Sequence, residues 1–248
     1  METTLNSTPF SYCAGCGHSV VHRILAEAID ELGIREKTIG VFPVGCSVAG
    51  PSFINVDAIV PAHGRAPAVA TGLKRMQPDK IVFAYQGDGD LASIGLTETV
   101  HTANRGENIT VIFLNNAIYG MTGGQAAPTS LPGQKTTTTP EGRKPETEGY
   151  PIPICEMLSV LRKPVYIARV TVTSPKEVLK AKAAIIKALR YQMEGKGYSL
   201  VEILSPCPTN WHLSPRGARD WTEREMTKYF PLGTFKDNPA EEEPCTKN

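Results

Sequence analysis

An aspartate and an asparagine that each follow an apolar run could together bind a metal ion. Asp88 belongs to the sequence GDGD at 87–90, shortly after the apolar run 81–85, and Asn116 directly follows the apolar run 109–114 and Asn115. Carboxylate and amide oxygens suit Mg²⁺, which commonly keeps phosphate oxygens in its coordination shell. Glycines beside Asp88 let a ligand approach the backbone closely. The pattern therefore predicts a Mg²⁺–diphosphate site at the ends of two strands.

Either half of this pattern would be weak alone, because Asp-Gly and Asn-Asn pairs are common in turns. Here the two halves follow two strand-like runs, and the sequence YGMTGGQ at 119–125 comes next. The combination favours a cofactor site over ordinary turns.

The GDG and NN motifs at this separation resemble the signature of thiamine diphosphate enzymes. The continuation IYGMTGGQ at 118–125 resembles the β subunit of the 2-oxoacid:ferredoxin oxidoreductases. The resemblance implies that Asp88, Asn116 and the backbone carbonyl of Ile118 bind Mg²⁺. It also implies a set of residues that contact thiamine diphosphate: Ser47, His63, Gly64, Gly87, Asp88, Gly89, Asp90, Asn116, Ile118, Tyr119, Gly120 and Thr122.

His63 lies in the sequence PAHGRAP at 61–67, which leads into a predicted helix. A helix N-terminus with a glycine can bind phosphate, and the resemblance places this segment against the cofactor. We expect His63 to contact the diphosphate or the reacting centre, the alternative being a loop histidine without a chemical role. Arg65 is expected to form a structural ion pair or a subunit contact. The other histidines show no chemical pattern: His18, His22, His101 and His212. Two of them, His22 and His101, lie in predicted helices and are expected to be solvated or capped.

Four of the six cysteines could converge on one metal centre. Cys13 and Cys16 share a tight turn before a predicted helix, whose N-terminus stabilises thiolate charge. Cys46 and Cys207 each follow a predicted strand. Four cysteine ligands suit a [4Fe–4S] cluster or a tetrahedral Zn²⁺ site, and spacing alone leaves both open, although zinc sites more often have two close pairs. The resemblance favours the cluster, because CAGCG, GCS and SPCP match the ligand positions of the family.

Composition limits the possible classes of protein. The chain has 248 residues and a net charge of +1, so nothing indicates binding to nucleic acid or to an anionic membrane surface. The N-terminus lacks a secretory signal pattern and no apolar run is long enough to span a membrane, which predicts a cytoplasmic protein with reduced thiols. Cys155 is expected to be a small buried hydrophobe, and Cys245 an exposed residue of a polar tail.

Apolar periodicity predicts the elements that must position these residues. The expected helices and strands alternate along the chain: helices 17–33, 66–75, 92–104 and 175–194, and strands 38–42, 80–85, 109–114, 165–172 and 200–204. Such alternation predicts an α/β, doubly wound and mostly parallel sheet, and the resemblance makes it the thiamine diphosphate-binding fold. Ligands bind beyond the carboxyl ends of the strands in such sheets.

Two segments fall outside this alternation. We expect residues 1–230, including the N-terminal cysteine segment, to form the diphosphate-side domain, with 231–248 as an extended C-terminal tail. The segment 126–152 is rich in Pro, Thr and Gly and is expected to be a long loop: an active-site lid, a subunit contact or a flexible insertion.

The resemblance also implies the reaction and the partners. It implies coenzyme A-dependent oxidative decarboxylation of a 2-oxoacid, with electrons passing through a [4Fe–4S] cluster to ferredoxin. No second thiamine-type domain is evident in the sequence, so an α subunit is expected to supply the pyrimidine-side domain and the activating glutamate. Further small subunits can belong to such a complex.

The substrate is predicted from departures within the motifs. In the family that the motifs resemble, enzymes for pyruvate or 2-oxoglutarate often carry a basic residue a few positions after the cysteine of the GCS motif. Here the residues after Cys46 include Val48 and Ala49 but no Lys or Arg. Met121 stands at a position where pyruvate enzymes of the family can have Asn. Both departures favour an apolar substrate side chain, so 3-methyl-2-oxobutanoate is the best candidate and 2-oxoglutarate the alternative. Two other hypotheses for the function are a non-redox thiamine diphosphate decarboxylase or ligase, and a non-catalytic interaction subunit with a structural zinc site.

Overall fold

The computed structural model of the chain describes residues 3–238. Within these residues, seven strands form one sheet in the spatial order β2-β1-β3-β4-β6-β5-β7. Strands β1 to β6 pair in parallel, and β7 is antiparallel to β5. The strand bounds are β1 (Thr38–Val41), β2 (Asp57–Ile59), β3 (Ile81–Gly87), β4 (Thr110–Asn115), β5 (Tyr166–Thr171), β6 (Ser199–Leu204) and β7 (Gly233–Asp237).

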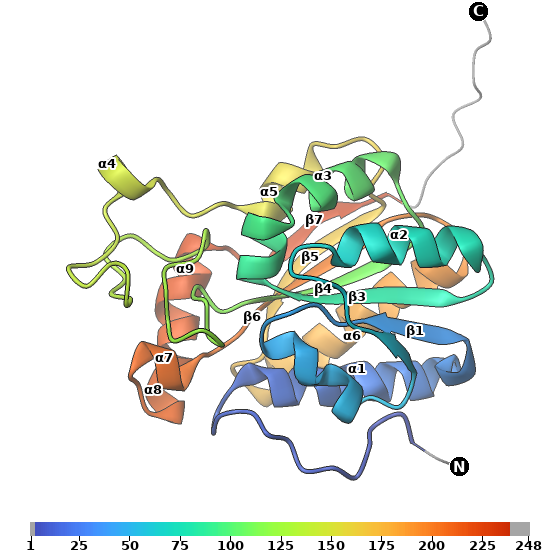
Figure 1. Cartoon of the computed structure of the whole chain (residues 1–248), viewed down its shortest axis with the longest axis horizontal. Helices are drawn as coiled ribbons and strands as arrows, with labels where there is room; N and C mark the ends of the chain where they lie inside the picture. Colours follow the sequence, from blue (N-terminus) through green and yellow to red (C-terminus); the bar gives the residue numbers. More distant parts are fainter. Residues whose placement is uncertain (1–2, 239–248) are drawn as a thin grey trace, which may run out of the picture.

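Helices cover both faces of the sheet (Figure 1). Helices α1 (Gly17–Leu32) and α6 (Pro175–Met193) pack on one face, and α2 (Ala66–Met76), α3 (Leu96–Arg105) and α5 (Ile154–Ser159) pack on the other. The short helices gather at one end of the sheet: α4 (Pro145–Glu148), α7 (Pro208–Trp211), α8 (Pro215–Trp221) and α9 (Thr227–Tyr229). Four irregular helices complete the described chain: the 3-10 helices η1 (Arg35–Lys37) and η2 (Cys46–Ser52), and the π-helices η3 (Asp90–Ile94) and η4 (Thr222–Met226).

The central strands and long helices form where the sequence pattern places them. Strand β4 is buried at every position, as expected of a parallel strand covered on both faces. Gly33 ends α1 with a left-handed φ of 63°, and its N–H bonds the last carbonyls of the helix. Ser174 caps α6 by accepting the N–H of Glu177. At these elements the expected bounds differ from those of the structure by at most one residue at either end.

The predicted helix 92–104 is wrong at its start, because the chain first forms the π-helix η3 and α3 begins only at Leu96. A Cβ added at Gly95 would lie 2.5 Å from the carbonyl oxygen of Gly64. The wide turn and the missing side chain let the segment around Gly64 pack against this junction. Such π-turns are frequent at functional sites.

The C-terminal tail is extended, but it is paired rather than free. Residues Gly233–Asp237 form the edge strand β7 beside β5. Residues 239–248, with Cys245, lie outside the described residues, and the domain boundary at 230 stays a prediction. No helix within 3–238 combines the length and apolar character needed to cross a membrane.

Candidate active site

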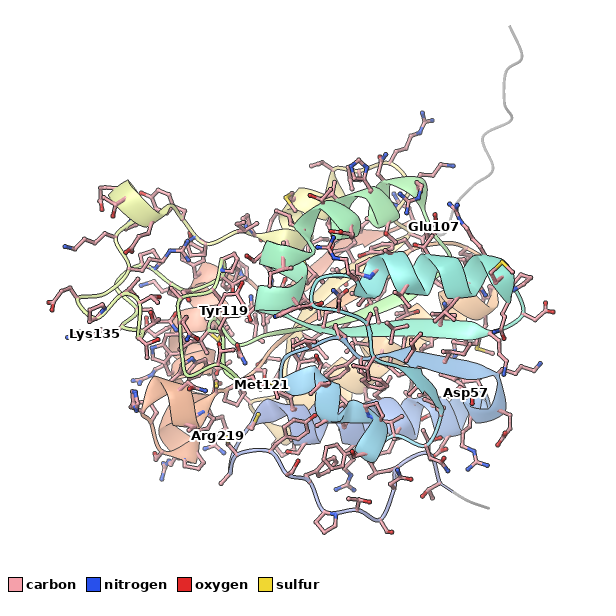
Figure 2. All side chains as sticks on the ribbon, in the orientation of Figure 1. Asp57, Glu107, Tyr119, Met121, Lys135 and Arg219 are labelled. Atoms are coloured by element: carbon pink, nitrogen blue, oxygen red, sulfur yellow. The ribbon has the colours of Figure 1, made fainter. Side chains whose placement is uncertain are left out.

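One pocket opens at the carboxyl ends of β1, β3 and β4, on the side of the 126–152 loop, where Tyr119 and Met121 lie (Figure 2). Most of the predicted site residues line it: Cys46, Ser47, His63, Gly87, Asp88, Gly89, Asp90, Asn116, Ile118, Tyr119, Gly120, Met121 and Thr122. Gly64 is not part of the lining. The lining also includes three residues that the sequence analysis missed: His18, Val44 and Gly45.

Asp88 is buried and accepts hydrogen bonds on both carboxylate oxygens. Its Oδ1 accepts the N–H of Gly89 at 2.8 Å, and its Oδ2 accepts the N–H of Ile118 at 3.1 Å and the hydroxyl of Thr129 at 2.7 Å. Burial raises the pKa of Asp88 to about 6, although these hydrogen bonds act in the opposite direction. A cation beside the carboxylate would stabilise its charged form, so the site fits a hard metal ion.

The turn that carries Asn116 has an unusual backbone. Ala117 adopts a φ of 56°, a left-handed conformation that is unfavourable for alanine. The side-chain oxygen of Asn115 accepts the N–H of Ala117 at 3.1 Å, and that of Asn116 accepts the N–H of Ile118 at 3.3 Å. The turn thus brings Asn116 and Asp88 to the same amide. The expected role of the Ile118 carbonyl as a metal ligand stays a prediction.

His63 is oriented by Asp90. Its Nδ1 lies 2.5 Å from Asp90 Oδ1, which also accepts the N–H of Gly64, and Asp90 Oδ2 accepts the side-chain amide of Gln86 at 2.6 Å. With Nδ1 donating to the carboxylate, Nε2 of His63 is an acceptor. Asp90 lines the pocket, but its oxygens position His63 and Gly64.

Arg65 forms the expected ion pair, with Glu98, and also donates to the carbonyl of Ile94 at 2.6 Å. His101 is exposed, in line with its expected solvation, but the interpretation of His22 as a solvated or capped helical residue is wrong. The imidazole of His22 is fully buried, bonds the Tyr12 hydroxyl at 2.8 Å and stacks on Tyr85. His22 lies on the same face of α1 as the buried apolar residues, and that face packs against the core.

His18 is the histidine that the sequence analysis failed to place in the site. It is buried on α1, lines the pocket and lies with its Nδ1 3.0 Å from the Tyr85 hydroxyl. Burial lowers the pKa of His18 to about 4, so the ring is neutral at physiological pH. Its position directly after the CAGCG segment was the available signal.

Gly89 and Tyr119 are in close contact. A Cβ added at Gly89 would lie 2.0 Å from Cε1 of Tyr119, so only glycine fits beneath this ring. The Tyr119 hydroxyl donates to the carbonyl of Gly89 at 3.3 Å. The glycine motif therefore accommodates a residue of the following strand end as well as a ligand.

The four-thiol corner, made of Cys13, Cys16, Cys46 and Cys207, adjoins the pocket. A Cβ added at Gly120 would lie 3.5 Å from the sulfur of Cys207 and 3.7 Å from that of Cys46. Burial, and then the charges of the neighbouring thiols, raise the pKa of Cys16 to about 12 and that of Cys46 to about 11. Four thiolates would thus repel one another unless a cationic group lay between them.

Within residues 3–238, no three His, Cys, Asp or Glu side chains are placed to hold one metal ion. The chemistry of the four thiols fits a thiolate-bound metal centre, either a [4Fe–4S] cluster or a zinc ion. Cys155 lies apart from it, buried as expected, although its thiol also donates to Glu202 at 3.0 Å.

The mouth of the pocket is apolar in part. Val44 and Met121 both line it and are 41% and 58% exposed. Val48 and Ala49, which the sequence analysis assigned to a substrate pocket, are half-buried in η2 and absent from the lining. The 3-10 turn after Cys46 carries them past the pocket. The apolar character therefore comes from Val44 and Met121.

The loop 126–152 is an ordered part of the site. Arg143 is buried and donates to the carbonyls of Ala127 at 3.0 Å and Ser130 at 2.7 Å, which folds the loop back on itself. Ser130 donates to the carbonyl of Ala117 at 2.6 Å, and Thr129 donates to Asp88. These contacts favour a structured loop over a flexible insertion, and its role as a lid or a subunit contact stays a prediction.

Comparisons with known proteins agree with this geometry. Residues 43–203 match the family of the thiamine pyrophosphate enzyme, C-terminal TPP binding domain. The solved 2-oxoglutarate:ferredoxin oxidoreductase from Magnetococcus marinus, with 2-oxoglutarate, coenzyme A and succinyl-CoA bound, is 28% identical with a TM-score of 0.77, covering 96% of this chain and 84% of that one.

Two curated relatives are similar over most of the chain. The ketoisovalerate oxidoreductase subunit VorA of Methanothermobacter thermautotrophicus is 51% identical over 97% of this chain, which spans only 50% of that protein. The 2-oxoglutarate synthase subunit KorB of Methanocaldococcus jannaschii is 34% identical over 92% of this chain and 88% of its own length. The chain thus spans about half the length of its VorA relatives.

Proposed function

Because the chain belongs to the thiamine pyrophosphate-binding subunits of the 2-oxoacid oxidoreductases, we propose that it is the β subunit of a 2-oxoacid:ferredoxin oxidoreductase. The reaction would be the coenzyme A-dependent oxidative decarboxylation of a 2-oxoacid. The observation that carries the proposal is the buried Asp88 beside Asn116, at a pocket that adjoins four thiols.

Asp88 and Asn116 would hold Mg²⁺, with the Ile118 carbonyl as a third ligand. When bound, thiamine diphosphate supplies the electron sink that decarboxylation needs. Thr129 and the N–H groups of Gly89 and Ile118 fix the Asp88 carboxylate before any ligand arrives. Such preorganisation means that the site needs little rearrangement on binding.

His63 would accept a proton at its Nε2, and once protonated there it could donate a hydrogen bond to a phosphate oxygen. Asp90 holds the ring through Nδ1 and thereby fixes the tautomer. Neutral His18 supplies a second imidazole to the lining. The activating glutamate would come from an α subunit, and further small subunits would complete the complex. Val44 and Met121 are exposed at the mouth of the pocket, where substrate and partner subunit would meet.

The four-thiol corner would hold a [4Fe–4S] cluster that passes electrons to ferredoxin. Support comes from the donor set of four neighbouring thiols and from the similarity to a solved 2-oxoacid:ferredoxin oxidoreductase. We also propose a cytoplasmic location, because the cysteines within the described chain are all free and thiols persist in reducing compartments.

The best candidate substrate is 3-methyl-2-oxobutanoate. Two observations support it: the identity of 51% to a ketoisovalerate oxidoreductase subunit, and the apolar Val44 and Met121 at the pocket mouth. The alternative is 2-oxoglutarate, which is bound in the solved relative. A panel of 2-oxoacids with the anaerobically purified complex distinguishes them, since ferredoxin reduction that is fastest with 2-oxoglutarate would overturn the substrate assignment.

The Asp88→Ala variant of that complex tests the function itself. We expect it to lose Mg²⁺-dependent binding of thiamine diphosphate, because the remaining amide ligand carries no charge. Titration calorimetry with and without Mg²⁺ measures this loss. Unchanged binding would refute the site, and also favour a non-catalytic subunit, whereas cofactor binding without iron or ferredoxin reduction would favour a non-redox decarboxylase or ligase.

A further inference from the structure

A buried cation lies in the sheet close to the cofactor turn but outside the pocket. Arg169 on β5 is 1% exposed and stacks over the rings of Phe230 and Phe235. Its Nε donates to Glu202 at 2.7 Å, and its two Nη atoms donate to Glu156 at 2.9 and 2.6 Å. Replacement of such buried pairs by apolar residues is often neutral or stabilising, so stability alone does not explain its presence.

Glu202 connects this cation to the cofactor turn. Arg169 and Glu202 lie opposite each other on the paired strands β5 and β6. One carboxylate oxygen of Glu202 accepts from Arg169 and from the thiol of Cys155, and the other accepts the side-chain amide of Asn115 at 2.8 Å. Asn115 is the last residue of β4 and is fully buried.

The carboxylate determines which way the Asn115 amide points. A carboxylate only accepts hydrogen bonds, so the NH₂ group of Asn115 must face Glu202. The oxygen of Asn115 is then turned toward the N–H of Ala117, which it accepts at 3.1 Å. That hydrogen bond ends on the N–H of Ala117, the residue whose backbone is left-handed.

We propose that Glu202, held in place by Arg169, is a positioning residue for the metal-binding turn. By fixing the amide of Asn115 it stabilises the left-handed Ala117, which in turn directs Asn116 and the N–H of Ile118 toward Asp88. The inference rests on the proposed function, in which Asp88 and Asn116 bind Mg²⁺ and thiamine diphosphate.

The Glu202→Gln variant keeps the size of the side chain and removes its purely accepting character. Its new NH₂ group must face a donor, either Arg169 or Asn115, and the Asn115 amide can then turn its own NH₂ toward Ala117. Glu156→Gln is the matched control. It removes a carboxylate from the same arginine at the surface end of the network, where the Glu156 side chain is 39% exposed.

Titration calorimetry of the anaerobically purified, cofactor-depleted complex provides the test. We expect Glu202→Gln to raise the Kd for thiamine diphosphate at limiting Mg²⁺ by about 10- to 100-fold, the usual range for residues that orient a metal ligand. Glu156→Gln should bind like the wild type. Asn115→Ala, one step closer to the turn, should match Glu202→Gln, and the double variant should be no weaker than the weaker single variant.

Each result decides one point. Three results would overturn the positioning role. The first is wild-type affinity in Glu202→Gln or Asn115→Ala, and the second is an equal loss of affinity in Glu156→Gln. The third is a double variant whose loss is the product of the two single losses. Asp88→Ala, measured alongside, separates this from the proposed function. If Asp88→Ala still binds the cofactor, the function and the inference both fall, whereas its loss together with an unaffected Glu202→Gln removes the inference alone.

Discussion

The oxygen site around Asp88 and the four-thiol corner lie at the same end of the sheet but are built differently. Asp88 follows a central strand, is 3% exposed, and receives three hydrogen bonds from the protein. The thiols come from an N-terminal turn and two loops, and they range from the exposed Cys13 to the buried Cys16 and Cys207. The side-chain amide of Asn210 donates to the sulfur of Cys207 at 3.5 Å.

The difference indicates two ways of preparing a site for a ligand. The oxygen site is oriented by internal hydrogen bonds in the absence of a ligand. The thiol corner gathers thiols that would repel one another when ionised, with little else to orient them, so a group bound there would supply much of its cohesion. Variants in the two regions should therefore fail in different ways.

Cys207→Ser should have the largest effect and should affect one region only. We expect complete loss of cluster absorbance, because a neutral hydroxyl is a poor substitute for a buried thiolate ligand. Binding of thiamine diphosphate, measured by calorimetry, should persist since the Asp88 hydrogen bonds are untouched. An unaltered visible spectrum would place the fourth ligand elsewhere, and loss of cofactor binding would mean that the two regions are one unit.

Thr129→Val tests whether the loop fixes the carboxylate. The change is nearly isosteric and removes the hydroxyl donor to Asp88. We expect the Kd for Mg²⁺ and thiamine diphosphate to rise about tenfold or more, since a hydrogen bond to a charged group contributes roughly 1.5–3 kcal/mol. Thr136→Val is the control, because Thr136 is buried in the same loop and bonds Thr139 instead. Equal losses in both variants would indicate general loosening of the loop.

The pH dependence of Mg²⁺ binding should report on Asp88. Burial raises its pKa to about 6 in the metal-free protein. A proton therefore competes with Mg²⁺ below this pH, and affinity should rise from pH 5 to 6 and level off above it, with about a tenfold deficit at pH 5. Affinity of Mg²⁺ for free thiamine diphosphate at each pH supplies the correction. A flat corrected profile would contradict the raised pKa.

Asn210→Ala should have the smallest effect. Its amide donates to the sulfur of Cys207 and to the carbonyl of Gly120 at 2.9 Å. Loss of a donor to a cluster sulfur disfavours the more negative, reduced state, so the midpoint potential should fall by tens of millivolts, equivalent to about 1 kcal/mol. Redox titration followed by electron paramagnetic resonance measures the shift. A rise in potential would show that the thiol corner is not oriented as described.

Most of the sheet was predictable because buried parallel strands appear as continuous apolar runs. Strands β3 and β4 are such runs, and in helices α1 and α6 the apolar residues recur with the helical period. Strand β2 is only three residues long and exposed at each position, and β7 is a largely exposed edge strand, so neither has a buried apolar run to detect. The short helices from 208 to 229 pack around Met226 and Phe230 in a small cluster of their own.

The candidate site was predictable where the motif itself supplies the residues. Asp88, Asn116 and Tyr119 are local to strand ends, and the structure brings them into one pocket. Thr129 and His18 reach the site through contacts with residues 41 and 67 positions away, Asp88 and Tyr85 respectively. Such contacts depend on the tertiary fold. Thr129 has no local signal in the sequence, and the only signal for His18 is its position directly after CAGCG.

The contact between Gly89 and Tyr119 has a consequence for how the chain can evolve or be redesigned. Any side chain at position 89 would meet the aromatic ring at once, so a lone change there is blocked for as long as the tyrosine remains. A library randomised at both positions should return substituted 89 only with a smaller residue at 119. The two sites would then vary as a pair, although 30 positions separate them in the chain.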